Sequence, residues 1–195
     1  MKIIEPDGIV REAQQFLSPF CDARPGADAV ELVVLHGISL PPGRFGGPWI
    51  ERLFTGTLPE GQHSYLDASI GLRVSSHLLI TRPGELLQFV PLARRAWHAG
   101  LSRFGDRMRC NDFAVGIELE GCDDIPYTEP QYRCLTSLLR TLIGHYPELD
   151  PTRIAGHEHI APGRKTDPGP AFDWQRLERE LGVPRPCTQP SPYAG

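Results

Sequence analysis

The stretch Leu32-Val33-Val34-Leu35-His36-Gly37 sets the frame for the rest of the chain, because four consecutive apolar residues end at an imidazole and a glycine. Two of the four are β-branched, and a short apolar run of this kind is typical of a strand buried on both faces. We therefore expect a buried strand that stops at His36 and presents this imidazole at the edge of a crevice.

A second strand is predicted over Phe113–Gly121, where a carboxylate interrupts an apolar run. Because side chains alternate across a strand, Glu118 shares one face with Gly116 and Glu120. Val115, Ile117 and Leu119 share the opposite, apolar face. One face of this strand is therefore polar.

The stretch 156–170 holds three side chains suited to catalysis or metal binding: His157, Lys165 and Asp167. The Gly and Pro residues between them favour a fixed irregular loop over a helix. Neutral imidazoles and carboxylates are ordinary zinc ligands, and a cation beside them suits an oxygen that gains negative charge. With His36 as a third ligand, these residues suggest an open zinc site. Their spacing matches no short zinc motif, so the residues alone leave the metal hydrolase as one of several readings.

Size and composition indicate one soluble α/β domain with long loops. The chain has 195 residues, 40% of them hydrophobic, with 20 Gly and 20 Pro. No apolar run approaches the roughly 20 residues of a membrane span, and no secretion signal is present, so we expect a cytoplasmic protein without a membrane partner. A net charge of -4 disfavours nucleic acid as a partner. Five cysteines without a CxxC pair suggest free thiols.

The remaining patterns predict the other elements. We expect a short helix over 10–16, a surface excursion over 39–72 with a helix over 50–54, a hairpin of strands 74–80 and 86–90, a helix from Thr128 to Pro147, a strand over 154–156, and a helix between Asp173 and Gly182. Phe45 and Trp49 either border a ligand groove or pack within their own loop. His77 fits a core histidine better than a ligand, and His145 is expected to be exposed. Residues 1–183 form the expected domain and 184–195 a disordered tail, in a monomer.

Ordered blocks of this chain resemble the zinc-dependent N-acetylmuramoyl-L-alanine amidases of type 2, a family related to phage lysozyme and peptidoglycan-recognition proteins. The blocks are His36 with 38–43, then 54–58, 95–100, 110–113, 116–121, 160–162 and 165–169. The resemblance implies a mixed central sheet flanked by helices, with long loops that form a substrate groove. It implies one zinc ion held by His36, His157 and Asp167, with Glu118 as general base and Lys165 as transition-state stabiliser.

Asp167 stands where the recognition-protein branch has a cysteine, which favours the cytoplasmic branch of the family. The implied reaction is hydrolysis of the amide between the lactyl group of anhydro-N-acetylmuramic acid and L-alanine in small muropeptides. This reaction belongs to cell-wall recycling and can influence β-lactamase induction. The resemblance also suggests that Arg73 and Arg109 bind peptide carboxylates and that Trp97 and His98 contact substrate.

Two positions depart from the family pattern. Gly37 replaces an asparagine beside the first ligand, and His159 replaces Asn or Asp, where we expect it to lie just outside the ligand shell or compete as a ligand. Two alternatives stay open: a muropeptide-binding module without turnover, and an amidase that acts on polymeric wall outside the cytoplasm.

Overall fold

Six strands form the central sheet, in the order β12, β5, β11, β6, β7 and β3. Their bounds are Ile154–Gly156, Leu32–Ile38, Ala114–Glu120, Leu78–Ile80, Leu86–Gln88 and Gln14–Gln15. The first four are mutually parallel, β7 runs antiparallel to β6, and β3 is parallel to β7. The computed structural model describes residues 1–25 and 30–182 of the chain. The sheet is therefore mixed, as the resemblance implied.

The alternation of side chains along β5 and β11 gives the sheet two different faces. Val33 and Leu35 of β5, with Val115 and Ile117 of β11, belong to the main hydrophobic core. The opposite face carries His36 and Glu118, which are direct neighbours in the parallel register of these two strands. The register alone therefore brings the two polar side chains together, near the carboxyl ends of their strands.

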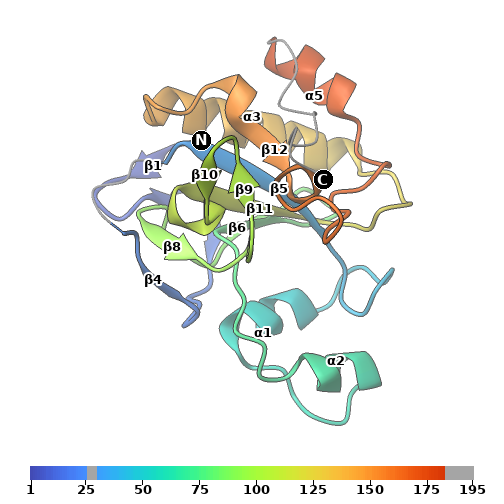
Figure 1. The fold of residues 1–195 in the computed structure, drawn as a ribbon. Coiled ribbons are helices and arrows are strands. Elements are labelled where there is room, and N and C mark those ends of the chain that lie inside the picture. The colour runs from blue at the N-terminus through green and yellow to red at the C-terminus, as the bar shows by residue number, and fades with distance from the viewer. Residues whose placement is uncertain (26–29, 183–195) are drawn as a thin grey trace.

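The helix α3 (Glu129–His145) lies over the apolar face of the sheet, and α5 (Trp174–Leu181) packs against α3 (Figure 1). A capping box starts α3: the side chain of Thr128 accepts the backbone N–H of Gln131, and the side chain of Gln131 accepts the backbone N–H of Thr128. The buried stripe of α3 includes Tyr132, Leu135, Leu138, Leu139 and Leu142. Asp173 caps α5, and this helix ends at Gly182 in the left-handed conformation.

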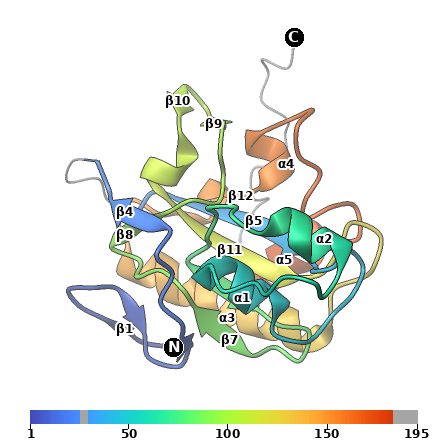
Figure 2. The same cartoon turned by 90° about the horizontal axis from the view of Figure 1, so that it is seen from below.

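The polar face is covered mainly by loops and by two short helices, α1 (Trp49–Thr55) and α2 (Ser64–Ser69), on the side opposite α3 (Figure 1). The remaining elements are short. They are the strands β1 (Ile3–Ile4), β2 (Ile9–Val10), β4 (Cys21–Ala23), β8 (Arg94–Ala96), β9 (Arg103–Phe104) and β10 (Arg107–Met108), the 3-10 helices η1 (Cys110–Asp112) and η2 (Pro151–Arg153), and the helix α4 (His157–Ile160). The β9–β10 hairpin and α4 project on the same side of the molecule (Figure 2).

Several predicted elements differ from the structure. The strand that carries His36 does not stop there but continues to Ile38, because β11 pairs with it over its whole length. Residues 10–16 form parts of β2, which pairs with β1 in a separate sheet, and of β3, which pairs with β7 at the edge of the central sheet, instead of a helix. The side chain of Gln88 accepts the backbone N–H of Val10 and so holds this segment beside β7. The first strand of the predicted hairpin begins only at Leu78.

The helices predicted over 50–54, 128–147 and 173–182 and the strands predicted over 86–90, 113–121 and 154–156 are confirmed within one or two residues, as is the antiparallel pairing of the hairpin. The 39–72 excursion holds a second helix, α2, and buries Leu53, Phe54 and Leu66 in a hydrophobic cluster, so it is not purely a surface loop. The stretch 156–170, predicted as a loop, begins with the one-turn helix α4. Residues 183–195 lie outside the described residues, so the disordered tail stays a prediction, as does the domain boundary at 183. No helix in the described ranges is long and apolar enough to cross a lipid bilayer.

Candidate metal centre

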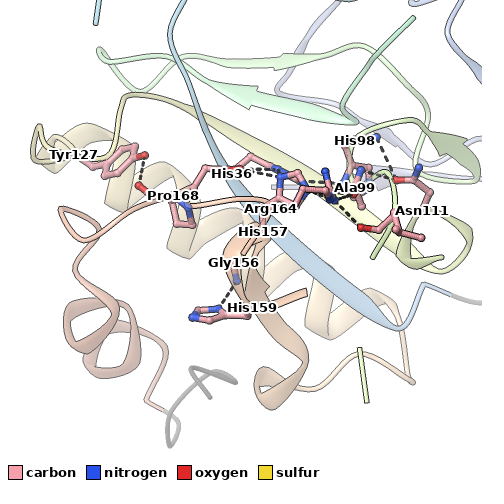
Figure 3. Close-up of polar contacts among 12 residues, drawn as sticks. His36, His98, Ala99, Asn111, Tyr127, Gly156, His157, His159, Arg164 and Pro168 are labelled. Carbon is pink, nitrogen blue, oxygen red and sulfur yellow. Dashed lines mark hydrogen bonds and ion pairs between the residues drawn. The ribbon is translucent and has the colours of Figure 1, made fainter. Parts of the chain in front are cut away.

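Three side chains converge at the carboxyl ends of the parallel strands: His36, His157 and Asp167. Figure 3 shows His36 and His157 side by side, although 121 residues separate them in the sequence. His36 extends from β5, and His157 is the first residue of α4, directly after β12. The Nδ1 atoms of the two imidazoles are 3.0 Å apart. Each of them lies 3.1 Å from Oδ2 of Asp167. The three atoms thus form a nearly equilateral triangle.

The hydrogen bonds of the two Nε2 atoms, which point away from the cluster, determine whether the Nδ1 atoms carry a proton. Nε2 of His157 lies 3.1 Å from the carbonyl oxygen of Ala99, which can only accept, so the proton is on Nε2 and Nδ1 is a bare acceptor. Nε2 of His36 lies 2.9 Å from Nδ1 of His98, which can accept its proton in the same way. With both protons outside, two nitrogen lone pairs and a carboxylate oxygen point at one place.

Three converging acceptors call for a cation, and the triangle has the right size for one. In a regular tetrahedron with ligand distances of about 2.0–2.1 Å, as zinc prefers, the edges are about 3.3 Å. The observed separations are 3.0 and 3.1 Å. Two nitrogens and one carboxylate oxygen leave the fourth position of a tetrahedral ion open, which is the arrangement of catalytic rather than structural sites. The residues present therefore fit a divalent metal ion of this type.

The protonation of the cluster also suits a metal. Burial lowers the pKa of His36 to about 4, although Asp167 opposes the shift, so the imidazole is neutral near pH 7. Burial alone would raise the pKa of Asp167, but His157 and His36 outweigh it and hold the pKa of the carboxyl well below its usual range. Neutral imidazoles and an ionised carboxylate are the forms in which these groups bind metals.

Glu118 lies beside this cluster because β11 pairs in register with β5. Its side chain is buried, and this burial, reinforced by the charge of Asp167, raises the pKa of the carboxyl well above its usual range, while Lys165 opposes the shift. Lys165 is exposed to solvent and belongs to the loop that follows α4. A buried carboxylate of raised basicity next to a candidate metal site is the arrangement expected of a general base.

One cavity of about 570 Å³ contains all five residues of the predicted zinc and catalytic set. Its other walls come from β5, the 39–72 excursion, Trp97, His98 and the segment 121–123. A second hollow of about 640 Å³ lies between the N-terminus, α3 and α5, far from this chemistry, and the candidate metal ligands do not line it. The first cavity is therefore the candidate active site.

The four predicted substrate-binding residues lie in different settings. Trp97 lines the cavity, and the guanidinium of Arg73 lies over its ring, 5.2 Å from the centroid. Arg109 is exposed, adopts a left-handed backbone conformation and pairs with Asp112 at 3.2 Å. His98 lines the cavity too, but its Nδ1 faces His36, and its Nε2 is buried with no hydrogen-bond partner among residues 1–25 and 30–182. Substrate contact by these residues stays a prediction.

The two departures from the family pattern have structural explanations. His159 lies on α4 rather than on an extended segment, so its ring points away from His157 and accepts the backbone N–H of Gly156 at 2.8 Å (Figure 3). It also packs against Trp174, which removes it from the metal cluster and contradicts its expected place near the ligands. A Cβ at Gly37 would collide with the hydroxyl of Tyr127, which fills that space.

Other predicted roles are settled by packing. His77 is buried, accepts the backbone N–H of Gly116 through Nδ1 at 3.0 Å and contacts the carbonyl of Arg94 through Nε2 at 2.9 Å, so it is a core histidine as predicted. His145 is only partly exposed and pairs with Glu5, contrary to prediction. Phe45 and Trp49 lie at a smaller neighbouring hollow rather than in the cavity wall.

Sequence reasoning assigned no role to Asn111, Ala99 or Tyr127, although each holds part of the site. Asn111 binds two backbone N–H groups beside the cluster, and Tyr127 donates to the carbonyl oxygen of Pro168 at 2.9 Å, next to Asp167. Asn111 stands in a block that resembles the family, which was the only signal for it. Tyr127 lies beside two glycines, Gly37 and Gly121, and no sequence pattern links them.

A mixed α/β sheet with an open His-His-Asp cluster beside a buried glutamate is typical of a metal-dependent hydrolase. The family model for N-acetylmuramoyl-L-alanine amidase matches residues 26–170, which is well over half of the chain. The chain therefore belongs to the N-acetylmuramoyl-L-alanine amidase family.

Named relatives agree with this assignment. The 1,6-anhydro-N-acetylmuramyl-L-alanine amidase AmpD of Salmonella typhimurium is 54% identical over 173 residues, which are 88% of this chain and 92% of the relative. A crystal structure of an AmpD derivative superposes with a TM-score of 0.87 at 49% identity, covering 92% of this chain and 99% of the other. The amidase AmiD of Escherichia coli, solved with the substrate anhydro-N-acetylmuramic acid-L-Ala-D-γ-Glu-L-Lys, has a TM-score of 0.59 at 27% identity and covers 93% and 66%.

Proposed function

We propose that this chain is a zinc amidase that hydrolyses the bond between the lactyl group of anhydro-N-acetylmuramic acid and L-alanine in small cytoplasmic muropeptides. This activity serves peptidoglycan recycling and, where a β-lactamase is inducible, lowers the level of the inducing muropeptide. The observation that carries the proposal is the convergence of His36, His157 and Asp167 on one point beside the buried Glu118. The relatives named for this reaction support it.

The roles follow from the positions of the side chains. His36, His157 and Asp167 would hold the zinc ion, which supplies an acidified water and polarises a carbonyl when it is bound. Glu118 takes the proton of the attacking water on a carboxylate oxygen and passes it to the leaving nitrogen of L-alanine. Lys165 offers its ammonium group to the oxygen that becomes negative at the attacked carbon.

The environment of Glu118 suits this proton transfer. Its raised pKa makes the carboxylate a stronger base than a solvent-exposed glutamate. Because the side chain is buried, little bulk water competes for the proton. Both features follow from its place on the inner face of β11.

The cytoplasm and a monomeric state belong to the same proposal. Cys21, Cys110, Cys122 and Cys134 are free thiols, which suits a reducing compartment, and Cys187 lies outside the described residues. Arg73, whose guanidinium lies over the ring of Trp97, and Arg109 would bind carboxylates of the stem peptide, with the cavity residues Trp97 and His98 beside the substrate.

A binding module without turnover is the main alternative, and the cavity argues against it. A pure binding site needs neither a buried carboxylate of raised pKa nor three bare acceptors beside it. An amidase for polymeric wall is the second alternative, and the free thiols argue against a secreted protein.

The test is to incubate the purified protein with anhydro-muramyl-tripeptide and, separately, with intact sacculi, and to identify products by mass spectrometry. We expect free tripeptide and anhydro-muramic acid from the soluble substrate, and at least a hundredfold less peptide from sacculi. Binding of the soluble substrate without product would support the binding module. Faster release from sacculi would support the wall amidase, and either result would overturn the proposal.

A further inference from the structure

One side chain holds the backbone of His98 and Ala99, the two residues that contact the Nε2 atoms of the candidate ligands His36 and His157. Oδ1 of Asn111 accepts the backbone N–H of His98 at 3.2 Å and that of Ala99 at 2.8 Å (Figure 3). Asn111 lies in the 3-10 helix η1 and is only partly exposed. A single amide oxygen therefore fixes the backbone of both residues.

The same two residues supply the hydrogen-bond acceptors for both imidazoles of the metal cluster. Nδ1 of His98 lies 2.9 Å from Nε2 of His36, and the carbonyl oxygen of Ala99 lies 3.1 Å from Nε2 of His157. An imidazole binds a metal through Nδ1 only when its proton is on Nε2. The segment held by Asn111 thus decides which nitrogen of each ligand is bare.

We propose that Asn111 and His98 are positioning residues for the metal centre: Asn111 clamps the 98–99 segment, and this segment sets the tautomer and the orientation of His36 and His157. The proposal rests on the proposed function, because it assumes a metal ion at this cluster. His98 then acts through His36, and this assignment gives its Nδ1 a role other than substrate binding.

The surroundings of His98 are built for this contact. Its ring lies against β11 at Gly116, where an added Cβ would stand 2.5 Å from Cγ of the ring, so any larger residue would displace it. The ring also packs edge-on against His77 at a centroid distance of 5.7 Å. A metal ion on Nδ1 of His36 would leave the proton of that ring on Nε2, so Nδ1 of His98, 2.9 Å away, would have to be the acceptor and His98 would carry its own proton on Nε2.

The 3-10 helix that carries Asn111 is itself held in place by Arg24. The guanidinium of Arg24 donates to the backbone carbonyl oxygens of Asn111 and Asp112, at 3.3 and 3.1 Å, and of Ala114, at 3.0 Å. η1 is thereby tied to the start of β11. Hydrogen bonds therefore connect the start of β11, through Arg24 and Asn111, to residues 98 and 99 and from there to the metal cluster.

The test compares matched pairs of variants at both positions. His98→Asn keeps an acceptor oxygen near the place of Nδ1, whereas His98→Gln moves the polar group towards the place of Nε2. Asn111→Asp keeps an oxygen that can accept both N–H groups, whereas Asn111→Leu has a similar size and no acceptor. The dissociation constant of zinc is measured by competition with a chromophoric chelator, and nitrogen-15 NMR of the imidazoles reports the tautomers.

We expect zinc to bind about ten- to hundredfold more weakly to His98→Gln and Asn111→Leu, the usual effect of losing a hydrogen bond to a metal ligand. His98→Asn and Asn111→Asp should stay within about threefold of the parent protein. In the metal-free Asn111→Leu protein, we expect part of the proton population of His36 to move from Nε2 to Nδ1.

Equal zinc affinities within each pair, or unchanged tautomers in Asn111→Leu, would overturn the proposal. Urea unfolding of the metal-free variants shows whether each one folds, and if Asn111→Leu does not, Asn111→Ser with its shorter reach replaces it under the same expectations. Zinc affinity is measured without turnover, so a failure of this inference is distinct from a failure of the proposed function, which would leave the parent protein unable to cleave the muropeptide.

Discussion

Replacing Glu118 with glutamine tests the role of the buried carboxylate with almost no change in shape. The substitution keeps the volume of the side chain and its place opposite His36 in the β5–β11 register. It removes the group that accepts the proton of the attacking water. Glu118 is not one of the three converging ligand atoms, so zinc content should not change.

The expected magnitudes differ for activity and stability. A positioned general base contributes about 10²- to 10⁴-fold, so kcat/KM should fall by that factor, or about 2.7–5.4 kcal/mol in the barrier. Stability should respond in the opposite direction. The pKa of the Glu118 carboxyl is raised on folding, so the metal-free native state binds a proton that the unfolded chain has already released. That linkage lowers the stability of the parent protein as pH rises from about 4.5 towards the folded pKa, and the glutamine variant lacks this loss.

The assay measures peptide release from anhydro-muramyl-tripeptide, zinc per chain by elemental analysis, and urea unfolding of the metal-free proteins at pH 7. We expect Glu118→Gln to hold one zinc ion, to unfold at the same or a higher urea concentration than the parent, and to lose at least a hundredfold in kcat/KM. Activity within tenfold of the parent, in a variant with full zinc content, would refute the assignment of Glu118 as the base.

Three further predictions follow from the structure. Tyr127→Phe should lower the free energy of unfolding by about 1–3 kcal/mol, because the buried carbonyl of Pro168 loses its donor, and urea unfolding that shows no change would contradict this. Burial lowers the pKa of His77 to about 3, so the imidazole stays neutral in the folded protein while it takes up a proton in the unfolded chain. As pH falls from 6.5 to 5, this residue alone should lower the free energy of unfolding by on the order of 2 kcal/mol. If the parent protein and a His77→Gln variant showed the same dependence of stability on pH, this effect of His77 would be excluded. Arg73→Ala and Arg109→Ala should each raise KM for the tripeptide about tenfold with little change in kcat, whereas a fall in kcat alone would argue against carboxylate binding.

The sequence predicted the elements whose signal is local. The apolar run at 32–35 and the alternation around Glu118 marked two central strands, and the capping box at Thr128 marked the start of α3. Each of these patterns depends on neighbouring residues, so it can be detected without the fold. Residues 10–16 form the short strands β2 and β3 instead of the predicted helix, because Gln88, far along the chain, accepts the backbone N–H of Val10 and β7 pairs with β3.

Within the site, the residue types pointed to the ligands but could not show their arrangement. Nothing between His36 and His157 indicates that the strand order places them side by side, and the resemblance to a family supplied that link. His159 was misplaced because α4 turns its side chain away, which an extended segment would not do. The contacts of Asn111 with residues 98 and 99 are backbone contacts across a loop, and these leave no periodic pattern.

The central claim is that cleavage of the lactyl-alanine amide depends on a zinc ion held by His36, His157 and Asp167. The most direct test follows peptide release from anhydro-muramyl-tripeptide by mass spectrometry with the protein as purified, after chelation, and after one equivalent of zinc is restored. We expect cleavage that disappears with the metal and returns with it in the parent protein, and no return in His157→Ala at the same zinc concentration. Undiminished cleavage by a protein shown to contain no metal would contradict it.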